Sequence, residues 1–368
     1  MKKKFIPTLL VLTSLCSCAF NGFTGLTVSG ENDIHTEYQL AYLNSEDYTD
    51  TGFACGTASW STPNPIKLSW KTKGGSASEY KITISEDEYI NNNDLVYYTS
   101  ETSFDFYNGK IGQTYYWNLT YKDIVSETAT FTVKSKGPRN LFIEGVENAR
   151  DIGGWGNIIK QGMLIRSGRL NSDKKTEVTN EITQNGINEM VNHLKIKTEI
   201  DLRRTSNNEV GGLTNKSVLG NQVLYVQLPM AYGGNNILTF KGKLSGDQTE
   251  YDNPAQIKAF FEILAEESYY PIHYHCSIGK DRTGCLSFLI EGLLGADEEY
   301  LYRDYMFTNY AKIGGTCKTD DIAKKYGQTL ANYENGSNLQ EKIYNYLQNE
   351  IGVSKETLDS VISILKAN

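Results

Sequence analysis

The sequence predicts a multidomain chain in which an all-β sandwich is followed by an α/β domain with a central sheet flanked by helices. Between residues 66 and 133, apolar and polar side chains alternate in several short runs separated by turn signals, as in strands with one buried face. Beyond residue 138, the β-type runs 198–202, 222–228 and 272–275 lie among segments whose apolar residues recur every three or four positions. That second pattern is typical of strands alternating with amphipathic helices.

The charge balance of the chain argues against general nucleic-acid binding. The 368 residues include 36 Lys and Arg against 44 Asp and Glu, which gives a net charge of −8. A nucleic-acid binder needs a basic footprint, and no such excess is present. We therefore expect no nucleic-acid partner. The hydrophobic content of 39% is sufficient for two globular cores.

The first 18 residues read as an export signal and not as part of the fold. Three lysines at positions 2–4 precede an apolar run, 5–15, that is too short to span a bilayer stably. The stretch LCSC at 15–18 resembles the bacterial lipobox, which implies cleavage before Cys18 and lipidation of that cysteine. We expect an exported, membrane-anchored cell-surface lipoprotein of a bacterium, and ordinary secretion without a lipid is the alternative.

The four other cysteines beyond the signal form no evident framework. Cys55 lies far along the chain from Cys276, Cys285 and Cys317. An even number of cysteines in an exported protein permits disulfides. Because no tight spacing links these four, we expect free thiols.

The chain is expected to divide near residue 138. Residues 19–60 are polar and without a clear period, so we interpret them as a linker that can contribute one edge strand. Residues 61–136 are the expected sandwich, which resembles a fibronectin type III or immunoglobulin-like module. This module shows no catalytic constellation and is interpreted as a spacer or docking module. The α/β domain is expected over residues 138–368.

The segment HCSIGKDRTG at 275–284 carries the chemistry of the α/β domain. A strand candidate runs into Cys276, and an apolar helix follows Arg282. A strand, a tight glycine-containing loop and a helix start form a cradle of inward backbone N–H groups, to which the helix dipole adds positive charge. Arg282 can grip two phosphate oxygens with its planar fork, and the positive loop favours the nucleophilic thiolate of Cys276.

This full string resembles the loop of the cysteine-dependent protein tyrosine phosphatases. Within them it is similar to a bacterial group related to secreted tyrosine and lipid phosphatases, whose loop reads HCxxGKDRTG. Three further stretches resemble segments of the same family: NARDIGG at 148–154, LIRSGRL at 164–170 and IDLR at 200–203. The resemblance covers residues 140–368 and does not include the sandwich.

The resemblance implies a two-step reaction. Cys276 displaces the alcohol or phenol to form a phosphocysteine, which water then hydrolyses, while Arg282 and the loop amides stabilise the equatorial oxygens. Thr283 is implied to hydrogen-bond the departing thiolate, and His275 to order the loop. The resemblance implies no metal and no other cofactor.

Two aspartates are candidates for the general acid. Asp281 lies within the loop, where relatives are thought to use an aspartate. Asp201 ends a predicted strand, and many phosphatases bring an acid from a separate upstream loop. We prefer Asp281, because Asp201 could instead brace backbone amides or Arg203.

Several residues are candidates for contact with phosphate or substrate. Lys280 is expected to attract phosphate or a lipid headgroup, and a solvated surface charge is the alternative. Arg150 and Asp151 match the family segment, although they could close a turn, and Arg166 could be ion-paired. The complete set of candidates is Ser277, Ile278, Gly279, Lys280, Asp281, Arg282, Arg150, Asp151, Arg166 and Arg203.

The sequence thus predicts a phosphoric monoester hydrolase that acts on phosphotyrosine in proteins. Phosphoserine, phosphothreonine and phosphoinositides are further candidate substrates. One alternative is an inositol-phosphate or phytate phosphatase, because such enzymes can use the same Cys-x5-Arg cradle. The other is a non-catalytic surface binding protein with a phosphatase-like fold, which the presence of nucleophile, arginine and candidate acid argues against.

Overall fold

The computed structural model describes residues 19–29, 32–49, 62–91, 94–171, 181–205, 209, 214–232, 237–312, 317–322, 330, 333 and 335–367. The predicted signal segment with Cys18, and Cys55, lie outside the described residues. The chain forms two compact units. The first consists of Met1–Ser29, Lys67–Phe104 and Tyr115–Phe131, and the second of Gly30–Ile66, Asp105–Thr114 and Thr132–Asn368.

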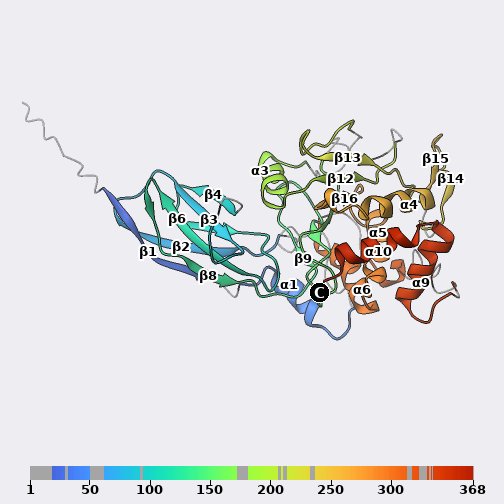
Figure 1. Ribbon diagram of the computed structural model, residues 1–368, viewed down its shortest axis with the longest axis horizontal. Coiled ribbons are helices and arrows are strands. Elements are labelled where there is room, and N and C mark those ends of the chain that lie inside the picture. Colours follow the sequence, from blue (N-terminus) through green and yellow to red (C-terminus); the bar gives the residue numbers. More distant parts are fainter. Residues whose placement is uncertain are drawn as a thin grey trace, which may run out of the picture. The chain divides into compact units, whose positions relative to one another are not determined.

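The described elements of the first unit are strands, which form two sheets (Figure 1). One sheet has the order β1-β2-β5, and the other has the order β4-β3-β6-β7 with β8 beside β6. The strands are β1 (Phe20–Ser29), β2 (Ile66–Gly74), β3 (Tyr80–Ser85), β4 (Leu95–Thr99), β5 (Ser103–Phe106), β6 (Thr114–Tyr121), β7 (Ile124–Val125) and β8 (Ala129–Thr132). The Trp70 ring lies 5.4 Å from Tyr80 and 6.4 Å from Trp117, so large aromatics fill the space between strands. The likeness to fibronectin or immunoglobulin modules stays a prediction.

The segment expected as a linker, 19–60, contains the edge strand that the sequence allows for it: residues 20–29 form β1, which pairs antiparallel with β2 at the edge of its sheet. The rest of its described part needs correction. Residues 37–44 form helix α1 (Glu37–Asn44), which begins with a capping box between Thr36 and Gln39. Tyr42 and Leu43 of α1 belong to the main core of the second unit. This segment therefore belongs to a folded unit, and the sequence missed it because the helix is short and its buried face includes the polar Gln39.

The second unit is an α/β fold around a six-stranded sheet of order β13-β12-β16-β11-β10-β9. Strands β13, β12, β16 and β11 pair in parallel, and β10 and β9 extend the sheet antiparallel. The strands are β9 (Arg139–Asn140), β10 (Arg150–Asp151), β11 (Leu164–Ser167), β12 (Thr198–Asp201), β13 (Leu224–Gln227) and β16 (Ile272–His275), with a separate hairpin of β14 (Lys241–Lys243) and β15 (Glu250–Asp252). The prediction of an α/β domain is confirmed, and the expected strand 272–275 has the predicted bounds.

Helices cover both faces of this sheet. The larger core packs α4, α5, α6, α9 and α10 against Leu164, Ile200 and Ile272, while α3 and η1 close a smaller core that includes Ile165 and Met190. The helices are α3 (Gln184–Asn188), η1 (Glu189–His193), α4 (Asn253–Leu264), η3 (Glu267–Tyr269), α5 (Arg282–Leu293), α6 (Glu298–Phe307), η4 (Thr308–Tyr310), α7 (Thr319–Ile322), α9 (Leu339–Tyr346), η6 (Leu347–Ile351) and α10 (Lys355–Leu365). Every residue of α5 is buried, which explains why apolar side chains occur around the whole helix, although Arg282 and Glu291 are buried there too.

Within the described part of the chain, no helix combines the length and the apolar character needed to cross a bilayer. The three cysteines there, Cys276, Cys285 and Cys317, are all free thiols, as expected.

Candidate active site

The site is built at the carboxyl ends of three parallel strands. The last residues of β11, β12 and β16 are Ser167, Asp201 and His275, and they lie in register. Residues 276–282, called here the cysteine loop, lead from β16 into α5. Ligand sites of open α/β sheets lie at this edge. Cys276 is 2% exposed and Arg282 6% exposed, so the two candidate groups are buried at opposite ends of one loop.

The carbonyl groups of the cysteine loop are bonded away from its interior. Ser277 O accepts from the backbone N of Arg169 at 3.0 Å, Ile278 O accepts from Asn148 Nδ2 at 3.0 Å, and Gly279 O accepts from Arg166 Nη2 at 2.7 Å. Among the described residues, no acceptor is found for the N–H groups of Ile278 and Gly279. Because C=O and N–H of a trans peptide point in opposite directions, these three bonds turn loop N–H groups inward.

Gly279 is required at its position. Its φ is +73°, and a Cβ there would lie 2.5 Å from Ser167 O. A side chain would therefore meet both backbone strain and a clash with β11. The glycine lets the loop pass directly over the end of this strand.

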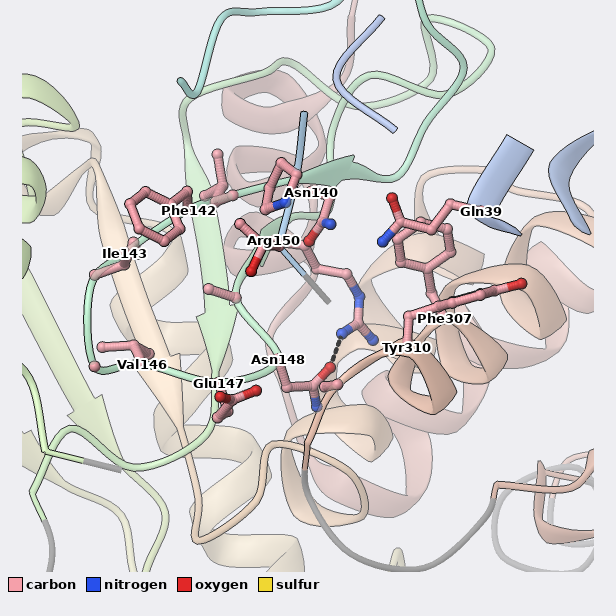
Figure 2. Close-up of a pocket in the computed structure, with 16 residues that line it drawn as sticks. Gln39, Asn140, Phe142, Ile143, Val146, Glu147, Asn148, Arg150, Phe307 and Tyr310 are labelled. Carbon is pink, nitrogen blue, oxygen red and sulfur yellow. Dashed lines mark hydrogen bonds between the residues drawn. The ribbon is translucent and has the colours of Figure 1, made fainter. Parts of the chain in front are cut away.

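Arg150 and Arg166 lie beneath the loop and contact protein groups. Arg150 Nε bonds Asp304 Oδ1 at 2.7 Å, and Arg166 Nη1 bonds Asp304 Oδ2 at 2.5 Å. Their side chains are 1% and 0% exposed. Arg150 also donates to Asn148 Oδ1, and Figure 2 shows this bond. The expected substrate contact of these two arginines is thus not what the geometry displays: they support the loop from behind.

Asp151 and Arg203 are buried in the same way. Asp151 accepts from the backbone N–H groups of Gly153 and Gly162 and pairs with Arg139, so it holds a turn. Arg203 bonds Asp201 through its side chain, at 2.7 Å from Nη2. Neither residue is brought to the cysteine loop by a described contact, and the alternatives stated from sequence, turn closure and ion pairing, describe them better.

Asp201 is held as an ionised carboxylate. It accepts from the backbone N–H of Arg203 at 2.9 Å and from the Tyr225 hydroxyl at 2.9 Å, and it is fully buried. Burial acts to raise the pKa of Asp201. The nearby charges of His275 and Arg203 lower this pKa by more than burial raises it, so it lies below its ordinary value. A carboxylate in this setting releases its proton readily and is poorly suited to donate one near neutral pH.

Arg282 donates hydrogen bonds to Glu209, a residue that the sequence did not identify as part of the site. Its Nη1 lies 2.7 Å from Glu209 Oε2 and its Nη2 3.2 Å from Glu209 Oε1, and Nη1 also donates to Leu202 O at 3.3 Å. A guanidinium has five N–H donors. These bonds use three, and leave the Nε–H and one Nη2–H, which lie on the same edge and form a fork for two phosphate oxygens.

Charge supports the same arrangement. Burial would lower the pKa of Arg282, but the charges of Cys276 and Glu209 raise it above its ordinary value. For Glu209, burial acts to raise the pKa, but the bonds and charges of Arg282 and Arg204 lower it to about 2. Glu209 therefore stays ionised. Only its position in a polar run, five residues after Arg204, was visible in the sequence.

The histidine before the nucleophile is part of a buried polar row. His275 Nε2 lies 3.0 Å from Glu199 Oε1, and its Nδ1 lies 3.2 Å from Cys276 O. The His273 ring stacks on it at 5.1 Å and bonds Ser167 Oγ at 2.7 Å. This row of contacts holds His275 in place at the start of the loop, and the ordering role implied for it stays a prediction.

Thr283, Asp281 and Lys280 complete the loop. Thr283 is fully buried in the first turn of α5, and among the described residues its Oγ1 has no hydrogen-bond partner. Asp281 is partly exposed and precedes α5 without a side-chain bond to its N-terminal amides. Lys280 Nζ lies 3.6 Å from Asp321 Oδ2, so the structure displays an ion pair for this lysine.

A separate pocket of about 100 Å³ lies beside the loop (Figure 2). Its lining includes Gln39, Phe142, Glu147, Asn148 and Tyr310, and no residue of the cysteine loop. Asn148 is the link, because its side chain bonds Ile278 O. The pocket is therefore distinct from the anion cradle. Among the described residues, no group of three or more His, Cys, Asp or Glu could hold a metal ion.

Comparisons with known proteins address the second unit. Residues 141–368 match the model of the tyrosine phosphatase family. A Cupriavidus necator protein with a provisional tyrosine-protein phosphatase name is 23% identical over 197 residues, which cover 47% of this chain and 64% of that protein. The chain thus spans less than two thirds of that relative.

Solved structures that the chain matches over part of its length include the core catalytic domain of a PP-IP phosphatase from S. cerevisiae in complex with citrate. It has 16% identity and a TM-score of 0.30, and the match covers 53% of this chain and 88% of that one. P. aeruginosa TpbA has 15% identity and a TM-score of 0.30, with 49% and 84% of the two chains covered.

Proposed function

This chain belongs to the tyrosine phosphatase family, and on that basis we propose that it hydrolyses phosphotyrosine through a phosphocysteine intermediate. One observation carries the proposal. The loop that joins Cys276 to Arg282 has three consecutive carbonyls bonded outward, by Arg169, Asn148 and Arg166. Such a loop offers inward N–H groups to a phosphate at the N-terminus of α5, next to a buried thiol.

The geometry supports a two-step displacement. Cys276 Sγ attacks phosphorus, and the bond to the phenol oxygen breaks as that oxygen takes a proton from the general acid. Loop N–H groups and the Nε/Nη2 fork of Arg282 bind the equatorial oxygens as charge develops on them. Water then attacks the phosphocysteine, releasing phosphate and restoring the thiolate. Thr283 Oγ1, at the start of α5, serves as the donor to that sulfur.

We assign the general acid to Asp281. It is partly exposed within the cysteine loop itself, directly before Arg282. Asp201 is fully buried and bonded to Arg203 and Tyr225. A proton donor must reach the leaving oxygen, and Asp281 meets that requirement better.

The substrate and the cellular location are supported by the family, by one relative and by the sequence. Phosphotyrosine is supported by the family description and by the name of the Cupriavidus necator relative. Phosphoserine, phosphothreonine and phosphoinositides are further substrates under the same chemistry. Export and anchoring through Cys18 are supported by the basic and apolar pattern of residues 1–18 alone.

Hydrolysis of p-nitrophenyl phosphate in the presence of EDTA tests the proposed reaction. Wild type should turn over, whereas Cys276→Ser should lose at least about ten-thousandfold in kcat because the nucleophile is gone. Cys285→Ala is the matched control, since Cys285 is a fully buried thiol on α5, the helix that follows the cysteine loop, and burial raises its pKa. Equal hydrolysis by wild type and Cys276→Ser would end the proposal.

A substrate panel then tests the specificity. Phosphotyrosyl and phosphoseryl peptides, a phosphatidylinositol phosphate and inositol hexakisphosphate are compared by kcat/KM. We expect the phosphotyrosyl peptide to rank first. A preference for inositol hexakisphosphate would keep the chemistry and replace the substrate.

A further inference from the structure

The carboxylate of Asp304 joins the two buried arginines on which the cysteine loop depends. Asp304 lies on α6, outside every motif that the sequence displays, and is 2% exposed. Its Oδ1 accepts from Arg150 Nε at 2.7 Å, and its Oδ2 accepts from Arg166 Nη1 at 2.5 Å. Its backbone carbonyl also accepts from Arg150 Nη2 at 2.8 Å. One residue therefore sets the position of both guanidinium groups.

Each arginine continues to a different carbonyl of the cysteine loop. Arg166 Nη2 donates to Gly279 O at 2.7 Å. Arg150 Nη1 donates to Asn148 Oδ1 at 2.5 Å, and Asn148 Nδ2 donates to Ile278 O at 3.0 Å. Figure 2 shows Arg150 directed at Asn148. Two chains of hydrogen bonds thus run from a single carboxylate to consecutive peptide groups.

The direction of these carbonyls decides the direction of the N–H groups opposite them. In a trans peptide the two point to opposite sides, so holding Ile278 O and Gly279 O also orients the N–H groups of Gly279 and Lys280. We propose that Asp304 is a positioning residue for phosphate binding, which acts through Arg150 and Arg166 to direct these two N–H groups at the phosphate. This role rests on the proposed function, because it requires that phosphate binds in the loop.

Charge within the cluster explains why one carboxylate is needed. Burial acts to raise the pKa of Asp304. The charges of Arg150 and Arg166 lower this pKa by more than burial raises it, so Asp304 is ionised between them. Glu291, also buried there, has its pKa raised by burial and by the charge of Asp304, which favours its neutral form. Burial and the charge of Arg166 lower the pKa of Arg150, as expected for two neighbouring cations. Without a negative charge at 304, these guanidinium groups repel each other and shift the carbonyls that they hold.

The central experiment compares two neighbouring substitutions in the full chain. Arg303 is 2% exposed on the same helix, but its guanidinium donates to the carbonyls of Tyr42 and Ser45. Asp304→Asn should raise the inhibition constant of vanadate by about tenfold, and the KM for p-nitrophenyl phosphate with it. Arg303→Met should lower the melting temperature but leave vanadate inhibition within about twofold of wild type. Equal vanadate effects, or a folded Asp304→Asn with unchanged vanadate inhibition, would overturn the role.

A double-mutant cycle tests whether Asp304 acts through Arg166. If Asp304 acts through Arg166, Asp304→Asn placed on Arg166→Met should change the vanadate constant by less than about twofold further. Two effects that multiply would show that Asp304 and Arg166 act independently, which contradicts the proposal.

A milder variant covers the case in which Asp304→Asn does not fold. Asn148→Gly keeps a residue suited to the φ of +59° found there, and removes the link to Ile278 O. The vanadate constant should rise about threefold without a large loss of stability. An unchanged inhibition constant for vanadate would contradict the proposed role of the hydrogen bonds that run from Asp304 through Arg150 to the cysteine loop.

Failure of this role and failure of the proposed function are distinguishable. A wild-type chain that neither hydrolyses p-nitrophenyl phosphate nor binds vanadate removes the function itself. A wild-type chain that does both, while Asp304→Asn behaves like Arg303→Met, removes only the role of Asp304.

Discussion

The cysteine loop and the segments 148–154 and 164–170 resemble the same family, but they face the site from opposite sides. In the proposed reaction, the loop presents N–H groups and the fork of Arg282 to the phosphate. The two segments bind the carbonyls of that loop from behind, through Asn148, Arg166 and Arg169. A loop can offer a row of N–H groups only if the carbonyls of the same peptides find donors elsewhere. A motif arginine can therefore serve to hold a loop without touching the substrate.

The same substitution made in both regions should give the largest difference between them. Arg282→Lys should lower kcat/KM for p-nitrophenyl phosphate by about a thousandfold, because lysine lacks the fork that remains beside Glu209. Arg166→Lys should cost only about tenfold, because it weakens the support of one carbonyl. Steady-state kinetics give the ratio of the two losses in kcat/KM, and thermal unfolding confirms that both variants are folded. Equal losses would place both arginines on the substrate and remove the difference between the regions.

The two aspartates allow a second contrast. Asp281→Asn should lower kcat by about a hundredfold for phenyl phosphate, whose leaving group needs a proton, and much less for p-nitrophenyl phosphate. Asp201→Asn should act on stability, because it removes the partner of buried Arg203. Both variants are assayed with both substrates. If the dependence on leaving group is found in Asp201→Asn, the acid role moves to that residue.

The parts of the site that sequence predicts are those in which residue type and spacing carry the chemistry. Cys276 and Arg282 flank a glycine loop, and the strand before it has the expected bounds. The parts that it does not predict depend on contacts between distant segments. Glu209 reads as one acid in a polar run, and Asp304 as one charge in an amphipathic helix, because nothing local distinguishes a buried carboxylate from a solvated one.

The fold shows the same division. Helix α4 (Asn253–Leu264) is one of the segments beyond residue 138 in which apolar residues recur every three or four positions, and local pattern predicts it because its apolar face is periodic over several turns. Helix α1 was expected as linker, because eight residues with a buried Gln39 give no periodic signal. Its position depends on Tyr42 and Leu43, which pack into a core formed mostly by residues more than a hundred positions away. Short segments that are stabilised by tertiary packing cannot be predicted from the local sequence pattern.

Glu209 offers the finest test, because it positions Arg282 as Asp304 positions Arg166. Glu209→Gln keeps an acceptor but loses the charge, so the KM for p-nitrophenyl phosphate should rise about fivefold with a smaller change in kcat. The chain should also lose about 2 kcal/mol of unfolding free energy at pH 7, since a charge-assisted pair with Arg282 is weakened. Urea unfolding and steady-state kinetics of both chains measure these losses.

The pH dependence of that stability difference identifies its source. The folded chain holds the pKa of Glu209 at about 2, whereas an unfolded glutamate titrates near 4.3. A carboxylate with a lowered folded pKa contributes stability that is complete above the unfolded pKa and is lost as pH falls toward the folded one. The difference between wild type and Glu209→Gln should therefore be constant from pH 8 to about 6 and shrink between about 4.5 and 2. A difference that stays constant down to pH 3 would mean that the charge of Glu209 is not what holds Arg282, and the guanidinium plane would then be set by packing and the Leu202 carbonyl alone.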